Sequence, residues 1–232
     1  MNFDDPSLKF VIKKLLIAKE DVIASTIDAL SKAPKEKFGE DAYIHELIPR
    51  LVQQYEKTDP GILVALLTMN YLRLKPGQCI YIPADGIHAY LAGDIIECMA
   101  RSNNVLNSGF CPQADRDVEL FMSCLTFTPH KAEECIVESQ AFDRSKEGKT
   151  KIYAPPLSEF NMLATQLGEG EHEMIGKIDG PSVMIVTKGS GKMKAEGKEF
   201  ELGEGSIFFI GHNEEVEFEA KSGLQMFTAF VE

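Results

Sequence analysis

The sequence predicts an α+β protein in which an N-terminal helical bundle precedes β-barrel or jelly-roll segments. Apolar residues recur at helical spacing up to residue 72. Beyond it, short apolar runs bounded by Gly, Pro, Asn or Asp dominate, which is typical of strands. We therefore divide the chain into a helical domain (1–72), a partial barrel (73–130), a linker (131–150) and a second β domain (151–232).

Three helices are expected in the helical domain. The first begins at Asp5-Pro6, a capping residue followed by a proline suited to a first turn, and Pro34 and Gly39 end it. A second helix is expected from Asp41 to Tyr55, with Pro49 as an irregularity inside it, and a third begins at Asp59-Pro60. The apolar face of the first helix consists of Leu8, Val11, Ile12, Leu15, Leu16, Val22, Ile23, Ile27 and Leu30.

The β segments follow. In the partial barrel we expect strands at Cys79–Ile82, His88–Leu91 and Ile95–Met99, and a short helix at 113–125. The linker is rich in Lys and Glu and contains no strand pattern. Regular spacing and Gly-rich turns predict a sandwich or barrel in the second β domain. Its strands are expected at Phe160–Leu167, Gly180–Thr187, Gly191–Ala195, Phe200–Leu202, Ser206–Ile210, Val216–Ala220 and Gln225–Val231.

Charge and cysteine content restrict the partners and the compartment. The 24 basic and 36 acidic residues give a formal net charge of -12, which argues against nucleic acid or an anionic membrane as partner. The five cysteines lack C-x-x-C spacing, so we expect small buried thiols in a reducing compartment. No apolar run approaches the ~18 residues of a membrane span, and the N-terminus lacks the apolar core of a signal peptide. We expect a cytoplasmic protein.

The most informative stretch is residues 81–100. It places His88 in a turn between apolar runs, with Gly86 beside it, and neutral imidazole is a good ligand for zinc. Glu97 lies within the apolar run Ile95–Met99, where we expect its side chain to be buried. A buried carboxylate requires a partner, so Glu97 is either a catalytic acid or a structural acid bonded to the turn around His88.

These residues carry a resemblance. The spacing of Gly77, Pro83, Gly86 and His88 is similar to a cupin motif. The run GIHAYLAGDIIECMARSNNVLNSGFCPQ, which starts at Gly86, resembles the signature of type I phosphomannose isomerases, and Tyr153–Phe160 resembles another segment of that family. The resemblance covers the whole chain. It implies the C-terminal two-thirds of such an enzyme: a helical insertion, part of a catalytic cupin barrel and a C-terminal barrel.

The resemblance implies an activity and a site. The family interconverts mannose 6-phosphate and fructose 6-phosphate through an enediolate, using zinc, so the implied partner is a small sugar phosphate. By the same resemblance His88 is a metal ligand, Glu97 is the active-site acid, and Tyr90 and Asp94 complete the catalytic set.

Four positions of this sequence differ from the family pattern. The signature arginine is Asn107, its lysine is Gln113 and its aspartate is Asn103, while Arg101 replaces a small residue. We assign Arg101, Asn107 and Gln113 to substrate binding. Each lost cation removes charge-assisted bonds worth roughly 1.5–3 kcal/mol. The family's other ligands, a Gln, a His and a Glu, lie upstream of the helical insertion, and nothing in residues 1–72 resembles their Q-x-H unit.

Three functions remain open. The chain is an isomerase homologue completed by a further segment or another chain, a truncated non-catalytic paralogue that acts as a binding or scaffold module, or a cupin-barrel enzyme that uses Glu97 on a less anionic substrate. An incomplete barrel exposes strand edges, so we also expect a homodimer or a partner chain that completes the barrel.

Overall fold

The computed structural model describes residues 5–102, 105–156 and 159–232, and Asn103 lies outside these ranges. The chain forms two compact units that alternate along the sequence. The first unit contains the chain up to Arg73, with Ile82–Gly93 and Ser102–Glu134. The second contains Leu74–Tyr81, Asp94–Arg101 and Cys135–Glu232.

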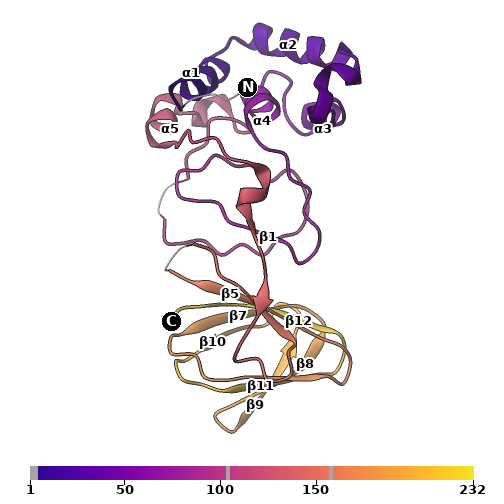
Figure 1. Ribbon diagram of the computed structural model, residues 1–232, viewed down its shortest axis with the longest axis vertical. Coiled ribbons are helices and arrows are strands. Elements are labelled where there is room, and N and C mark those ends of the chain that lie inside the picture. The colour runs from indigo at the N-terminus through magenta and orange to yellow at the C-terminus, as the bar shows by residue number, and fades with distance from the viewer. Residues whose placement is uncertain (1–4, 103–104, 157–158) are drawn as a thin grey trace. The chain divides into compact units, whose positions relative to one another are not determined.

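The first unit is helical, as expected (Figure 1). A buried Asp59 caps α4 by accepting a 2.7 Å hydrogen bond from the backbone N–H of Gly61, which confirms the Asp59-Pro60 start. Residues 113–125 form a 3₁₀ turn, Gln113–Asp115, and a helix, in agreement with the prediction. The helices are α1 (Asp5–Leu16), α2 (Glu20–Lys32), α3 (Tyr43–Gln54), α4 (Pro60–Thr68) and α5 (Val118–Cys124), and a 3₁₀ segment covers Lys35–Asp41.

The single first helix expected up to Pro34 is wrong, because the chain breaks between α1 and α2. Lys19 is extended, with φ -68° and ψ 147°. Ile12 and Leu16 of α1 pack in one apolar cluster with Val64 of α4, whereas α2 packs in a second cluster with α3 and α4. One straight helix cannot direct a single face at both clusters, so the periodic pattern continues through a bend.

Two of the strands expected in the partial barrel are also wrong. His88–Leu91 and Ile95–Met99 have irregular backbone, and in the described part of this region only β1 (Cys79–Ile80) pairs, with β2 (Ile136–Val137). Alternating apolar residues form a strand only where a neighbouring strand accepts their backbone hydrogen bonds. The described residues offer no such neighbour to either run.

The second unit is an antiparallel sandwich, whose two sheets lie one above the other in the orange and yellow part of Figure 1. One sheet has the order β10-β7-β12-β5-β4-β3 and the other β6-β11-β8-β9. The sheets are not closed into a barrel, and the α+β class is confirmed. The strands are β3 (Gln140–Ala141), β4 (Thr150–Tyr153), β5 (Asn161–Leu167), β6 (His172–Ile175), β7 (Ser182–Lys188), β8 (Ser190–Ala195), β9 (Lys198–Gly203), β10 (Ile207–Ile210), β11 (Val216–Ala220) and β12 (Leu224–Phe230).

Strict alternation builds the sandwich core. In β12 every second side chain is buried, and Met226 and Phe230 are each 1% exposed. The expectation that 131–150 lacks strands is wrong, since β2 and β3 lie within it and β4 starts at Thr150. The strand β6 was not expected either.

The buried carboxylate of Glu173 fixes residues 145–150, the segment that leads into β4. Glu173 in β6 is fully buried, so an unpartnered charge there would be costly. Burial raises the pKa of Glu173, but its hydrogen bonds outweigh burial and hold the pKa below its ordinary value of 4.5. The groups that donate are Ser145 Oγ at 2.6 Å, Thr150 Oγ1 at 3.1 Å, and the backbone N–H of Glu147 at 3.0 Å, Lys149 at 2.8 Å and Met174 at 3.0 Å.

Candidate functional site

His88 lies in the first unit, at the end of a tight turn. The N–H of Gly86 donates to the carbonyl of Pro83 at 3.1 Å, and Asp85 has a φ of 61°. Thr126 fixes this turn, because its backbone N–H and its hydroxyl donate to the carbonyl of Asp85 at 3.0 and 3.2 Å. The turn therefore holds the imidazole on a defined backbone.

The hydrogen bond of His88 determines its tautomer. Nδ1 lies 2.9 Å from the carbonyl oxygen of Gly86, and a carbonyl only accepts, so Nδ1 carries the proton. In a neutral ring the lone pair is then on Nε2, the arrangement in which a histidine binds a metal. The ring also contacts Tyr90 edge-on, with centroids 5.7 Å apart. His88 and Tyr90 are both exposed.

The structure places the remaining signature residues in two different units. Asp94, Glu97 and Arg101 belong to the second unit, whereas Asn107 and Gln113 belong to the first. The expectation of a buried Glu97 is wrong, because its side chain is exposed, as are Ile95 and Ile96 beside it. Burial of Glu97 required the strand Ile95–Met99, and this segment does not pair within the described residues.

One interaction that the sequence did not reveal orders the end of the signature. The Asp59 carboxylate is 5% exposed and lies 2.8 Å from Nη2 of Arg116. It also accepts hydrogen bonds from the N–H of Phe110 at 3.0 Å, and Arg116 donates to the carbonyl of Cys111 at 2.7 and 3.0 Å. These contacts fix the backbone that precedes Gln113.

Two glycines allow this close approach. A Cβ atom on Gly109 would lie 2.5 Å from the Cα of Gly61, and one on Gly61 would lie 2.9 Å from the Cα of Gly109. Neither position has room for a side chain. The segment that carries the exposed side chains of Asn107 and Gln113 is thus held against the start of α4.

The second family-like segment fixes another turn. The Tyr153 hydroxyl donates a 2.5 Å hydrogen bond to the carbonyl of Gly77, whose φ is +84°. Tyr153 is buried at the end of β4. This contact connects two motifs that lie 76 residues apart in the sequence.

The described residues do not provide a metal centre. Within them no group of three or more His, Cys, Asp or Glu side chains is placed to hold an ion. A catalytic zinc requires three protein ligands and an open position, and His88 supplies one. Zinc therefore does not fit the residues that the described part of the chain brings together.

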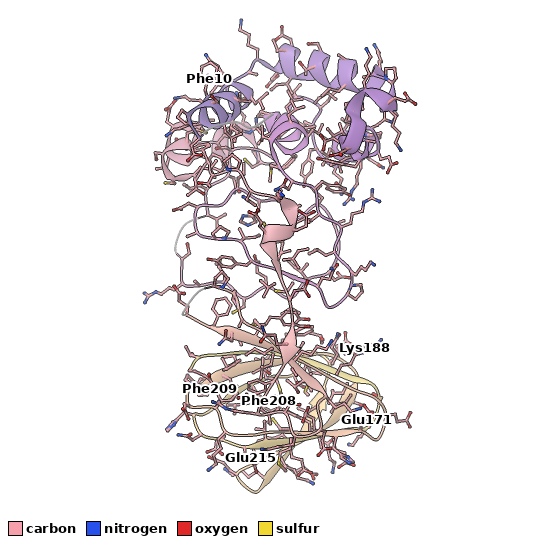
Figure 2. The ribbon with its side chains drawn as sticks, viewed as in Figure 1. Phe10, Glu171, Lys188, Phe208, Phe209 and Glu215 are labelled. Carbon is pink, nitrogen blue, oxygen red and sulfur yellow. The ribbon has the colours of Figure 1, made fainter. Side chains whose placement is uncertain are left out.

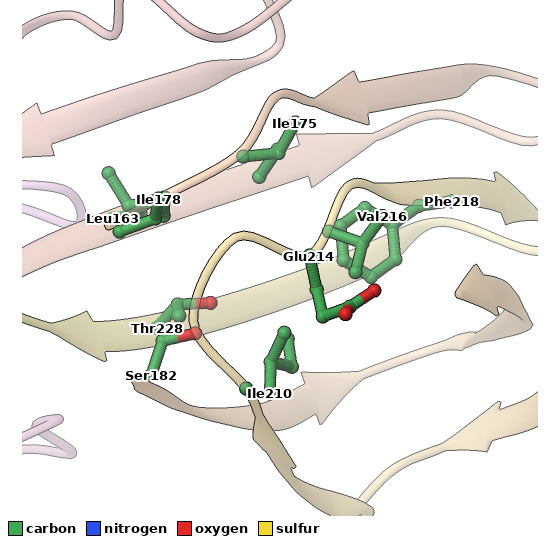
Figure 3. Close-up of a pocket in the computed structure, with 10 residues that line it drawn as sticks. Leu163, Ile175, Ile178, Ser182, Ile210, Glu214, Val216, Phe218 and Thr228 are labelled. Carbon is green, nitrogen blue, oxygen red and sulfur yellow. The ribbon is translucent and has the colours of Figure 1, made fainter. Parts of the chain in front are cut away.

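The sandwich interior contains a small cavity (Figure 3). Ser182 and Thr228 lie side by side in its wall, and Leu163 and Phe218 contribute apolar surface. Its volume is about 10 Å³, room for about one water molecule. A sugar molecule is larger than this cavity, so it does not fit between the two sheets.

Among the described residues, no helix is long and apolar enough to cross a membrane. The five cysteines are all present as thiols. Four are half-buried, and the expectation of buried thiols is wrong for Cys124, which is exposed.

Comparison with known families matches two descriptions to the second unit. Residues 151–198 match the family "Phosphomannose isomerase type I C-terminal". Residues 177–229 match "AraC-like ligand binding domain".

Relatives match nearly the whole chain. The mannose-6-phosphate isomerase of Saccharomyces cerevisiae is 36% identical over 97% of this chain and 53% of its own length. That of Cryptococcus neoformans is 34% identical over 97% of this chain and 52% of its own length. The chain spans about half the length of these curated relatives, a smaller share than the two-thirds we expected.

Solved structures show the same fold at lower identity. A variant of the phosphomannose isomerase of Salmonella typhimurium matches with a TM-score of 0.72 and 18% identity, over 99% of this chain and 56% of that one. The form of that enzyme bound to substrate and zinc matches with a TM-score of 0.69 and 17% identity, over 99% of this chain and 55% of that one.

Proposed function

The chain belongs to the type I phosphomannose isomerase family, and on this premise we propose that it is part of an aldose-ketose isomerase completed by further polypeptide. The reaction is the interconversion of mannose 6-phosphate and fructose 6-phosphate. The observation that carries the proposal is the signature from Gly86 to Gln113, whose described residues (86–102 and 105–113) have an irregular backbone and are largely exposed. Added strands would bury it.

Completion is required for the metal. The Salmonella relative holds zinc, and His88 has the tautomer of a ligand. The described residues supply no group of three ligands. We therefore expect negligible zinc binding by the chain alone. His88 contributes one ligand to a site whose other ligands come from the completing polypeptide.

Completion is also required for proton transfer. Glu97 is the acid/base that moves the proton between C1 and C2 of the sugar, with Tyr90 and Asp94 beside the reacting atoms. Proton transfer to and from a sugar carbon requires a site from which water is excluded. Glu97 is exposed, so a covering segment is needed.

Substrate binding is weakened by two neutral positions. The amide groups of Asn107 and Gln113 are able to donate hydrogen bonds but carry no charge, and Arg101 supplies one cation to a chain of net charge -12. Phosphate recognition depends on charge-assisted bonds. We expect a lower affinity for sugar phosphates than in a relative that has both cations.

The partners and the compartment follow from the same proposal. The macromolecular partner is the chain that completes the barrel, and neither nucleic acid nor membrane is a partner. We propose a cytoplasmic protein, consistent with the sugar phosphate substrate and the five thiols.

Reconstitution tests the proposal. The chain is mixed with the remaining half of the Saccharomyces cerevisiae relative, and isomerase turnover and bound zinc are measured. We expect no turnover and no zinc for the chain alone, and both for the mixture. His88→Ala should abolish them in the mixture, whereas His212→Ala, at an exposed turn, should not. A chain that isomerises alone, or a mixture that forms no complex, contradicts completion.

A non-catalytic binding module is the second candidate, and the neutral Asn107 and Gln113 favour it. This candidate requires that the chain form a stable complex with the remaining half of the yeast relative and that the complex show no isomerase turnover. Use of Glu97 on a less anionic substrate is the third, and it requires that Glu97→Gln remove an activity of the chain alone.

A further inference from the structure

The outer surface of the six-stranded sheet, which the proposed isomerase site does not use, is apolar near β10 and carries an exposed Lys151 in β4, opposite Ala164. Cross-strand pairing forms two adjacent apolar rows on it, each four strands wide. One row contains Ile207, Ile185, Phe227 and Ala164. The other contains Phe209, Val183, Ala229 and Met162. We call these eight residues the apolar rows.

The rows are most exposed at β10. Phe209 is 73% exposed, Ile207 is 65% exposed and Val183 of β7 is 50% exposed. The intervening Phe208 and Ile210 pack against the sandwich core instead. Figure 2 labels Phe208 and Phe209, which are neighbours on this strand. Contiguous exposed apolar surface of this kind marks an interaction site.

The strand β10 is also an open edge. It is the first strand of its sheet, and among the described strands it pairs with β7 alone. Edge strands are normally protected by charged side chains, proline or a bulge. The segment 206–211, SIFFIG, contains neither charge nor proline, and its register with β7 is continuous. Only the shortness of β10, four residues, opposes pairing.

We infer that β10 pairs antiparallel with β10 of a second copy of this chain. In a register centred on Phe208, each Ile207 lies opposite Phe209 of the second copy, so both rows continue across the two-fold axis. Apolar side chains then meet on the outer face and Phe208 meets its equivalent on the inner face. A strand from an unrelated protein would fit this edge only if it had the same alternation, with apolar side chains on the outer face and a large apolar side chain on the inner face.

The uncharged edge at β10 is where a second copy meets the least electrostatic repulsion. Two chains of net charge -12 repel each other over most of their surfaces, and they approach at least cost where both are neutral. The contact is small, because it contains one short strand and few side chains from each copy. It is well below the ~800 Å² per partner of a standard interface, so the dimer is reversible.

Light scattering of the full chain across a range of concentrations tests the inference. We expect the mass to rise from one to two copies as concentration increases. Phe209→Lys should keep the chain monomeric, since it places two charges against each other's apolar row. Gln166→Lys, exposed on the same sheet at β5, makes the same charge change away from β10 and should leave the dimer intact.

Hydrogen exchange supplies a second measurement. The backbone amides of residues 206–211 should gain protection as concentration rises, and those of β9, an edge of the other sheet, should not. A monomer at every concentration, or a dimer that Phe209→Lys leaves unchanged, overturns the inference. The inference is also overturned if the Phe209→Lys chain still dimerises but no longer binds the remaining half of the yeast relative. Isomerase reconstitution can fail without affecting self-association, so the two proposals fail separately.

Discussion

Arg116 and Asp59 are 57 residues apart in the sequence, and their side chains form an ion pair 2.8 Å long at the buried start of α4. The pair joins the beginning of a core helix to the last residues of the isomerase signature. The pair positions backbone, because its further hydrogen bonds go to backbone groups of Gly61, Phe110 and Cys111.

The first prediction concerns this ion pair. Asp59→Ala leaves the guanidinium of Arg116 largely buried without its counter-ion, and should lower the free energy of unfolding by about 3 kcal/mol. The exposed pair Lys13–Glu119 is the control, and Glu119→Ala should cost at most ~1 kcal/mol. Urea denaturation measures both values, and equal losses would contradict a special role for Asp59.

The second prediction concerns the contact between two glycines. Gly109→Ala forces the backbones of residues 109 and 61 apart, and should lower the free energy of unfolding by about 1–3 kcal/mol. Gly203→Ala meets no atom within 4 Å and should change stability little. Thermal melts of the two variants, compared with the unchanged chain, decide between a steric effect and a general intolerance of alanine.

The third prediction concerns pH. Because the pKa of Glu173 in the folded chain lies below its unfolded value, its ionised form stabilises the fold above about pH 4.5. That contribution disappears as pH falls through the folded pKa. Glu173→Gln should destabilise the chain at pH 7 and show a weaker decline of stability between pH 6 and pH 3. Parallel curves for the two proteins would show that this carboxylate is not responsible.

The fourth prediction concerns substrate affinity. In the reconstituted mixture, Asn107→Arg with Gln113→Lys should lower the KM for mannose 6-phosphate about tenfold or more, because charge-assisted phosphate bonds are restored. The same two charges on exposed helix positions, Ser25→Arg with Gln53→Lys, provide the control. An equal change in both double variants would indicate a general charge effect.

The fifth prediction concerns thiol reactivity. Burial raises the pKa of the Cys79 and Cys98 thiols, so at neutral pH a smaller fraction of each is the reactive thiolate. Cys124 is exposed. Iodoacetamide followed by mass spectrometry should show Cys124 modified before Cys79 and Cys98, and the reverse order would be inconsistent with the burial described here.

Local signals predicted the parts of the fold that depend on local contacts. The Asp59-Pro60 cap and the periodicity of α3 and α4 require only neighbouring residues, and both helices form. The strands β5 and β7 to β12 were also predicted, because turns and alternation define each hairpin, whereas β6 was missed. The break after α1 was missed because two separate clusters bury the two halves of one continuous pattern.

Long-range partners account for the errors at the candidate site. Ile95–Met99 has the composition of a strand, but a ladder depends on a second segment that composition does not reveal. Glu97 was expected to be buried for the same reason. The pairing of Asp59 with Arg116 was missed because no spacing rule connects residues so far apart. Only the cap at Asp59 was visible, and it accounts for one of that carboxylate's contacts.

The alternation of the two units along the sequence has a consequence for inheritance. The chain passes from one unit to the other at Arg73–Leu74, Tyr81–Ile82, Gly93–Asp94, Arg101–Ser102 and Glu134–Cys135. No single recombination point can therefore transfer one unit intact to another gene. A single cut after Glu134 separates the helices from all the strands of the sandwich, but it also takes Leu74–Tyr81 and Asp94–Arg101 away from the unit to which they belong.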